Sequence, residues 1–142
     1  MGKAKAVEDE LKELEKLMQK LRTGCILVEG KRDKLAFEKL GCRNVIPTVG
    51  RARVVCESLS SHHFPSFSGV PSLIYIIYIM TDFDRRGKQL AENLRLELES
   101  LSLSGDMETR KRLGRILRVK FFEDVHRLYN KKIEEMENGA FR

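Results

Sequence analysis

The sequence has few of the features that mark secreted or membrane proteins. Among its 142 residues there is no tryptophan, and its three cysteines show no Cys-x-x-Cys spacing. An odd number of cysteines without that spacing argues against a disulfide framework and a zinc site, and it indicates a reducing compartment. No apolar run reaches the ~18 residues of a membrane span, and the charged segment 1–20 lacks the apolar core of a secretory signal. We therefore expect a cytoplasmic protein with no membrane partner.

The regular structure is predicted from apolar runs that alternate with amphipathic patterns. Short runs suited to buried strands lie at 25–28, 44–47, 73–80 and 118–122, and helical patterns lie at 32–40, 53–60, 85–103, 107–117 and 124–136. Fully apolar strands followed by helices are typical of parallel sheets. The sequence predicts a single Rossmann-type α/β domain with about four mainly parallel strands, flanked by helices.

The domain limits follow from the same patterns. An amphipathic helix occupies residues 1–22, the α/β domain occupies 23–137, and a short frayed tail follows at 138–142. Residues 60–72 are rich in serine and proline and predict a loop.

The most informative stretch is Thr81-Asp82-Phe83-Asp84-Arg85-Arg86-Gly87, which follows the most apolar run. Side chains two apart on an extended segment point the same way, so Asp82 and Asp84 are expected to converge beyond the strand. Two such carboxylates ~6 Å apart repel by ~3 kcal/mol at an effective dielectric of ~20. Mg²⁺, with Mn²⁺ as an alternative, would offset that repulsion. The simpler interpretation is a turn in which one aspartate caps the next helix.

A second acidic position follows another buried run. Glu29 comes directly after the strand predicted at 25–28, and Gly30 and Lys31 follow it. Parallel strands end at the same edge of a sheet, where such folds bind ligands. If the two strands are neighbours, we expect Glu29 to meet Asp82 and Asp84 there in one acidic pocket.

The basic residues near this predicted pocket suggest a phosphate. Lys31, Arg85 and Arg86 would supply positive charge at its rim, and helix starts there favour anions. The formal net charge is +6, with nine Lys and Arg against three acids over 107–132 and seven against three over 31–57. This excess predicts a polyanionic partner, with nucleic acid, RNA or DNA, as the leading candidate. A surface that is merely rich in Lys and Arg is the alternative.

At these residues the chain resembles the Toprim domain of type IA topoisomerases, primases and 5S-rRNA-maturing ribonucleases. The matching pieces are Val28-Glu29-Gly30-Lys31, then Val49-Gly50, then Thr81 to Gly87, and the resemblance covers about residues 24–103. Small stand-alone Toprim proteins of archaea and some bacteria have a similar length. The resemblance implies a nuclease or a nucleotidyl transferase that depends on magnesium.

The resemblance also implies roles for single residues. Glu29 matches the family's general acid or base, which also binds metal, and Asp82 and Asp84 match its metal-binding aspartates. Gly50 is either a turn glycine or part of the phosphate-binding rim. The chain departs from the type IA motif at Arg86 and Lys88, where that motif has acids. The departure puts a second metal in doubt and favours direct contact with phosphate.

Two other functions remain open. The protein could be a binding module without turnover, in which the segments 31–53 and 110–120 contact RNA or DNA as part of a homodimer or a larger processing complex. It could also be a phosphatase of the haloacid-dehalogenase type, which uses the first aspartate of Asp-x-Asp as nucleophile. That family has Thr or Val two residues after the second aspartate, where this chain has Arg86.

Overall fold

Four short parallel strands form the central sheet of the computed structural model, which describes residues 2–60 and 76–140. The strands are β1 (Cys25–Val28), β2 (Val45–Pro47), β3 (Ile77–Ile79) and β4 (Gly105–Asp106), and their order in the sheet is β2-β1-β3-β4. The predicted α/β fold with about four parallel strands is confirmed. Of the predicted loop 60–72, only Ser60 is described, as the last residue of a helix, and the start of the predicted strand, 73–75, also lies outside the described residues.

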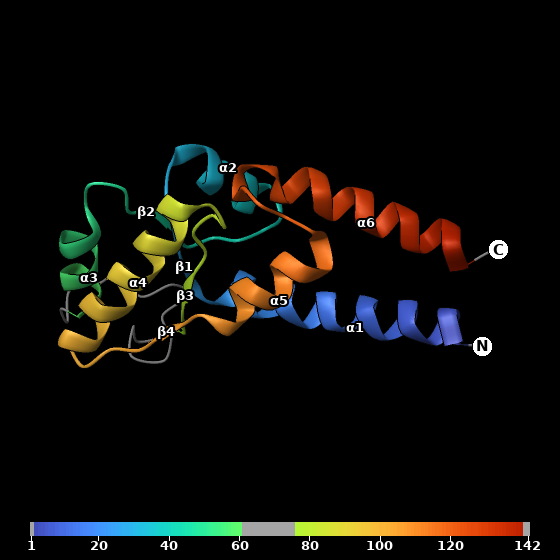
Figure 1. The fold of residues 1–142 in the computed structure, drawn as a ribbon, viewed down its shortest axis with the longest axis horizontal. Coiled ribbons are helices and arrows are strands. Elements are labelled where there is room, and N and C mark those ends of the chain that lie inside the picture. The colour runs from blue at the N-terminus through green and yellow to red at the C-terminus, as the bar shows by residue number, and fades with distance from the viewer. Residues whose placement is uncertain (1, 61–75, 141–142) are drawn as a thin grey trace.

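Helices cover both faces of this sheet (Figure 1). The helices are α1 (Gly2–Thr23), α2 (Lys31–Lys39), α3 (Ala52–Ser60), α4 (Arg85–Ser100), α5 (Glu108–Leu117) and α6 (Val125–Ala140), with a 3-10 turn, η3, at Phe122–Asp124. Helices α1, α2, α5 and α6 share one apolar core with the sheet, and α3 and α4 share the other. None of the helices within the described ranges has the length and apolar character needed to cross a membrane.

The apolar strands supply both cores because successive side chains point to opposite faces. In β1, Ile26 and Val28 join the core under α1 and α2, while Cys25 and Leu27 join the core under α3 and α4. Strand β3 alternates in the same way. A strand buried on both faces reads as a continuous apolar run, which explains why the sequence revealed these two strands.

Helices α1 and α6 lie side by side and extend together from the sheet, so the two chain ends lie at the same end of the molecule (Figure 1). Lys132 of α6 forms an ion pair with Glu10 of α1 at 2.6 Å. Helix α6 continues to Ala140, so the predicted tail is helical over residues 138–140. Residues 141 and 142 lie outside the described part.

The predicted fourth strand at 118–122 is wrong. Helix α5 ends at Leu117, Arg118 adopts a left-handed conformation with φ of 55°, and a 3-10 turn begins at Phe122. The strand is instead Gly105–Asp106, which pairs with β3 through Ile77↔Gly105 and Tyr78↔Asp106. Two residues without an apolar side chain carry no strand pattern. They form a strand only because they pair with β3, along the edge of β3 that faces away from β1.

Candidate functional site

Strands β1 and β3 are neighbours, and the two predicted acidic positions follow their carboxyl ends. The chain passes from β1 to β2 on one side, whereas β3 pairs with β1 on the other, so the strand order reverses between them. Ligands of open α/β sheets bind at such a switch point. Here Glu29 Oε1 accepts a hydrogen bond from the backbone N–H of Asp82 at 3.1 Å. The structure therefore brings Glu29 and Asp82 together, as predicted.

Asp82 is fixed by a segment distant in sequence. Its side chain is 9% exposed, and Oδ1 accepts a hydrogen bond from the N–H of Phe122 at 2.7 Å. The N–H of the adjacent Phe83 donates to the carbonyl of Lys120 at 2.9 Å. Burial raises the pKa of Asp82 to about 7, and the nearby carboxylates of Asp33 and Glu29 act in the same direction.

Glu29 lies at the edge of the same group of acids. Burial is the main cause that raises the pKa of its carboxyl group, and Asp84 and Asp33 add to the shift. The hydrogen bond from Asp82 N–H and the positive charge of Arg86 act in the opposite direction. The site thus contains carboxyl groups that resist ionisation because they share a small, partly buried space.

Asp84 occupies the cap of α4. Its Oδ1 accepts a hydrogen bond from the N–H of Gly87 at 2.8 Å, so the simpler interpretation, a capping aspartate, holds for this residue. Gly87 leaves room for the acids: a Cβ there would lie 2.0 Å from the carbonyl oxygen of Asp82 and 2.7 Å from Glu29 Oε1. The close approach of α4 to Glu29 and Asp82 therefore requires glycine at this position.

A fourth acid, Asp33, was missed in the sequence. It is 7% exposed, and its Oδ2 accepts a hydrogen bond from the N–H of Gly30 at 2.9 Å. Burial raises the pKa of Asp33, and Asp33 in turn raises that of Asp82. Its position three residues after Gly30, in the first turn of α2, is the signal of a capping aspartate that points back to the strand end.

Arg110 was also missed as a site residue, because the basic segment 110–120 was interpreted as a nucleic-acid contact. It is 5% exposed. Its Nε donates to the carbonyl of Thr81 at 2.7 Å and its Nη2 to the carbonyl of Asp82 at 2.6 Å. Its guanidinium carbon lies 4.3 Å from the centroid of the Phe83 ring. Arg110 thus holds the chain at the end of β3, and its buried guanidinium is not exposed to bind phosphate. Its spacing of three and seven from the buried Leu113 and Leu117 was the available signal.

A pocket of about 340 Å³ opens beside Glu29. It is lined by Glu29, Val49, Gly50, Arg85, Arg86, Gln89, Leu90 and Asn93. Four of the predicted site residues therefore share one pocket, namely Glu29, Gly50, Arg85 and Arg86. Gly50 has a φ of 74°, so the turn itself calls for glycine. Lys31, Asp82 and Asp84 are not among the lining residues, and Lys31 is an exposed residue at the start of α2.

The carboxylates do not form a preassembled metal cage. Within residues 2–60 and 76–140, no group of three or more His, Cys, Asp or Glu side chains is arranged to hold a metal ion. Mg²⁺ demands less than this, since it usually takes one or two carboxylates and keeps several waters. Glu29 and Asp82 fit that smaller demand, because the fold brings these two carboxylate residues together at the ends of β1 and β3.

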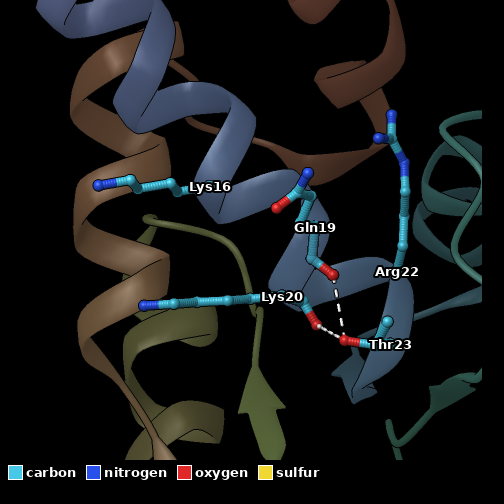
Figure 2. Close-up of a pocket in the computed structure, with 5 residues that line it drawn as sticks. All are labelled: Lys16, Gln19, Lys20, Arg22 and Thr23. Carbon is cyan, nitrogen blue, oxygen red and sulfur yellow. Dashed lines mark hydrogen bonds between the residues drawn. The ribbon is translucent and has the colours of Figure 1, made fainter.

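A larger pocket, of about 570 Å³, lies along α1. The described residues that line it are Lys16, Gln19, Lys20, Arg22 and Thr23. Figure 2 shows Lys16 and Lys20 extending to the same side of α1, while Arg22 extends away from them. Arg22 Nε donates to the carbonyl of Leu40 at 2.8 Å, so this arginine ties α1 to the end of α2. No predicted site residue lines this pocket, so the switch point remains the candidate site.

Comparison with known proteins places the chain among archaeal relatives. It is 38% identical over 122 residues to a UPF0292 protein of Thermococcus sibiricus, covering 83% of this chain and 89% of that protein. A UPF0292 protein of Pyrococcus abyssi is 34% identical over 119 residues, covering 81% and 83%, and one of Methanosarcina barkeri is 32% identical over 126 residues, covering 84% and 80%. The chain belongs to the UPF0292 family. No family model matches it.

A solved structure supports the fold of this UPF0292 chain. A putative protein from Aquifex aeolicus aligns with a TM-score of 0.60 and 22% sequence identity, covering 78% of this chain and 96% of that protein. At this level of identity the likeness supports the compact α/β fold alone, because one fold hosts many functions. The function has to be argued from the site.

Proposed function

We propose that the protein is a Toprim-like, magnesium-dependent protein that acts on the phosphodiester bonds of nucleic acid, as a nuclease or a nucleotidyl transferase. The observation that supports this most is the hydrogen bond from Asp82 N–H to Glu29 Oε1 at the switch point of the sheet. It joins the two acidic motifs of the sequence in one place, beside a pocket that also contains Arg85 and Arg86.

The carboxylates of Glu29 and Asp82 would hold the metal ion, with Asp84 close enough to add its negative charge. One Mg²⁺ bound there would polarise a phosphoryl oxygen and offset the charge that develops on it. Each carboxylate already receives one backbone N–H, from Asp82, Phe122 and Gly87 respectively. These bonds fix the side chains without loss of charge, so the acids are oriented before any ligand arrives.

Glu29 would transfer the proton to or from the nucleotide oxygen. Its raised pKa, caused mainly by burial, brings a carboxyl group closer to the range in which an acid or base is effective near neutral pH. Arg85 and Arg86 would bind the phosphate in the pocket that Gly50 also lines, and Lys31, exposed at the start of α2, would add positive charge.

Calorimetric titration with Mn²⁺ and Mg²⁺ tests the metal. We expect one ion to bind the wild-type protein and Asp82→Asn to weaken binding by about tenfold or more, since that change removes a ligand charge. Asp106→Asn is the matched control, because Asp106 likewise accepts a backbone N–H, from Thr109, but lies outside the group of acids. Equal binding by wild type and Asp82→Asn would reject the metal site.

A cleavage assay on structured RNA and DNA, with the metal found to bind, tests the chemistry. Glu29→Gln keeps the size of the side chain and can still accept the Asp82 N–H, but it cannot transfer a proton. We expect at least a hundredfold lower rate, the usual contribution of a general acid or base. A Glu29→Gln protein that cleaves as fast as wild type would exclude this role.

The second candidate is a nucleic-acid-binding module without turnover. The basic side chains of α5 and the residues after it favour it, since Lys111, Arg112, Arg115, Arg118 and Lys120 are all exposed. Arg110 is excluded from this surface because its guanidinium is buried on backbone carbonyls. Tight binding of RNA or DNA that falls steeply with salt, with no product under any metal, would favour this module over the enzyme.

A further inference from the structure

The pocket beside Glu29 contains more than the acid and the two arginines. Gln89, Leu90 and Asn93 of α4 line it together with Arg85 and Arg86. Arg86, Gln89 and Asn93 are spaced three and four apart, so they share one face of the helix. Val49 and Gly50, in the turn between β2 and α3, also line it.

The polar side chains of this wall are available to a ligand. Neither arginine forms an ion pair with another described residue, and neither amide has a side-chain hydrogen bond within the described ranges. Elsewhere on the same helix, Arg95 is paired with Glu92 and Glu99. The arginines and amides of α4 that line the pocket are therefore unpaired within the described ranges.

The chemistry of the wall matches the parts of a nucleotide. Guanidinium groups bind phosphate oxygens in a forked geometry. Side-chain amides carry both donors and acceptors, which are the groups that recognise the edges of nucleobases. Val49 and Leu90 offer apolar surface for the flat face of a base, and about 340 Å³ lies in the range of small-ligand pockets.

We propose that this pocket binds one nucleotide unit, with its phosphate at Arg85 and Arg86 beside Glu29, and its base against Gln89, Asn93 and Leu90. This inference rests on the proposed function and adds to it: the wall of α4 selects a nucleotide next to the reacting phosphate.

Calorimetry on the full chain in Mg²⁺ tests the proposal, with AMP, GMP, CMP and UMP as ligands and ribose 5-phosphate and inorganic phosphate as references. We expect at least one nucleotide to bind about tenfold or more tightly than ribose 5-phosphate, because amide–base contacts of this kind discriminate by about that factor. Equal binding of all four nucleotides and ribose 5-phosphate would overturn the base site.

The double variant Gln89→Ala, Asn93→Ala locates the site. We expect it to bind nucleotides about tenfold more weakly and ribose 5-phosphate unchanged, because it removes the amides and leaves the arginines. Gln19→Ala, which removes an exposed amide on α1, is the matched control and should bind as wild type does. A double variant with wild-type nucleotide affinity would overturn the proposal. Thermal unfolding checks that both variants fold.

The outcome is separable from that of the proposed function. If metal binding and cleavage depend on Asp82 and Glu29 but nucleotides bind no better than ribose 5-phosphate, the base site fails and the enzyme stands. If nucleotides bind through Gln89 and Asn93 but no metal or cleavage is found, the enzyme fails and the base site stands.

Discussion

The candidate site has an acidic side and an α4 side, the latter lining the pocket beside Glu29, and the two are built in different ways. On the acidic side, Asp82 and Asp33 are buried, and each accepts a backbone N–H: Asp82 from Phe122 in a distant segment, and Asp33 from Gly30 at the start of its own helix. On the α4 side, Arg85, Arg86 and Gln89 are exposed and make no side-chain bond to the described residues. The acidic side is therefore part of the fold, whereas the α4 side is free to bind. Substitutions should cost stability on the first side and only binding on the second.

The largest effect is expected at Gly87, where the two sides meet. In Gly87→Ala the new methyl group would lie 2.0 Å from the carbonyl oxygen of Asp82. Because that atom is backbone, β3 or α4 has to shift, and we expect the free energy of unfolding to fall by about 3 kcal/mol or more. Urea unfolding measures this. Gly139→Ala is the control, since a Cβ there meets nothing within 4 Å. Equal stability of both variants would show that the acids do not require the close approach of α4.

Arg110→Met should have the next largest effect. The change removes two hydrogen bonds to the carbonyls of Thr81 and Asp82 and leaves both acceptors buried, which costs about 3 kcal/mol. Arg112→Met removes only an exposed ion pair with Glu108 and should cost less than about 0.5 kcal/mol. Urea unfolding of both variants compares them. A loss for Arg110→Met as small as for Arg112→Met would contradict its structural role.

The pKa of Asp82 predicts a pH dependence of stability. Its pKa is raised from 3.8 to about 7 on folding, so the folded protein holds this proton more tightly than the unfolded chain. The stabilising contribution is complete below pH 3.8 and is lost as the pH rises to about 7. Asp82→Asn lacks this titration, so its stability relative to wild type should rise over that range, by about 4 kcal/mol.

Unfolding of wild type and Asp82→Asn between pH 4 and pH 8, without divalent metal, measures the difference. Asparagine retains an oxygen for the N–H of Phe122, so the packing is kept. A difference that is constant with pH would mean that the carboxyl group of Asp82 ionises as it does in the unfolded chain.

The smallest effect on stability is expected at Arg86, on the α4 side. Arg86→Ala should change the free energy of unfolding by less than about 0.5 kcal/mol, because the side chain is exposed and unpaired within the described chain. It should nevertheless weaken binding of phosphate ligands by about tenfold, the value of a charged hydrogen bond. Lys88→Ala is the control, because it removes an exposed cation of the same helix that does not line the pocket. Parallel losses of stability and binding in Arg86→Ala would end the contrast between the two sides.

The acidic motifs were predictable because each follows a buried strand whose residues are apolar throughout. Cys25 to Val28 and Ile77 to Ile79 are buried on both faces, so their ends, and with them Glu29 and Asp82, are marked in the sequence. Asp33 and Arg110 carry no such mark. Each is a charged residue in a helix with a polar surface, and only the packing of α2 and α5 against the strand ends buries them.

The same contrast explains the error in the fourth strand. The apolar side chains of Val119 and Phe122 suggested a strand, but these two residues lie three apart and both enter the core beside α2 and α6. A strand would have turned alternate residues to opposite faces. The real strand, Gly105–Asp106, owes its conformation to β3 and to the absence of a side chain at Gly105, where a Cβ would lie 2.6 Å from Ile79 Cδ1.

The sequence by itself determined the α/β class, the parallel sheet and the two strand ends that bear acids, because periodic burial and motif order are local properties of the chain. Only the tertiary structure decided that β1 and β3 are neighbours, that Asp33 and Arg110 join their ends, and that α4 turns its unpaired arginines and amides toward Glu29. Those facts depend on contacts between residues up to 53 positions apart, and such contacts are set by how whole elements pack.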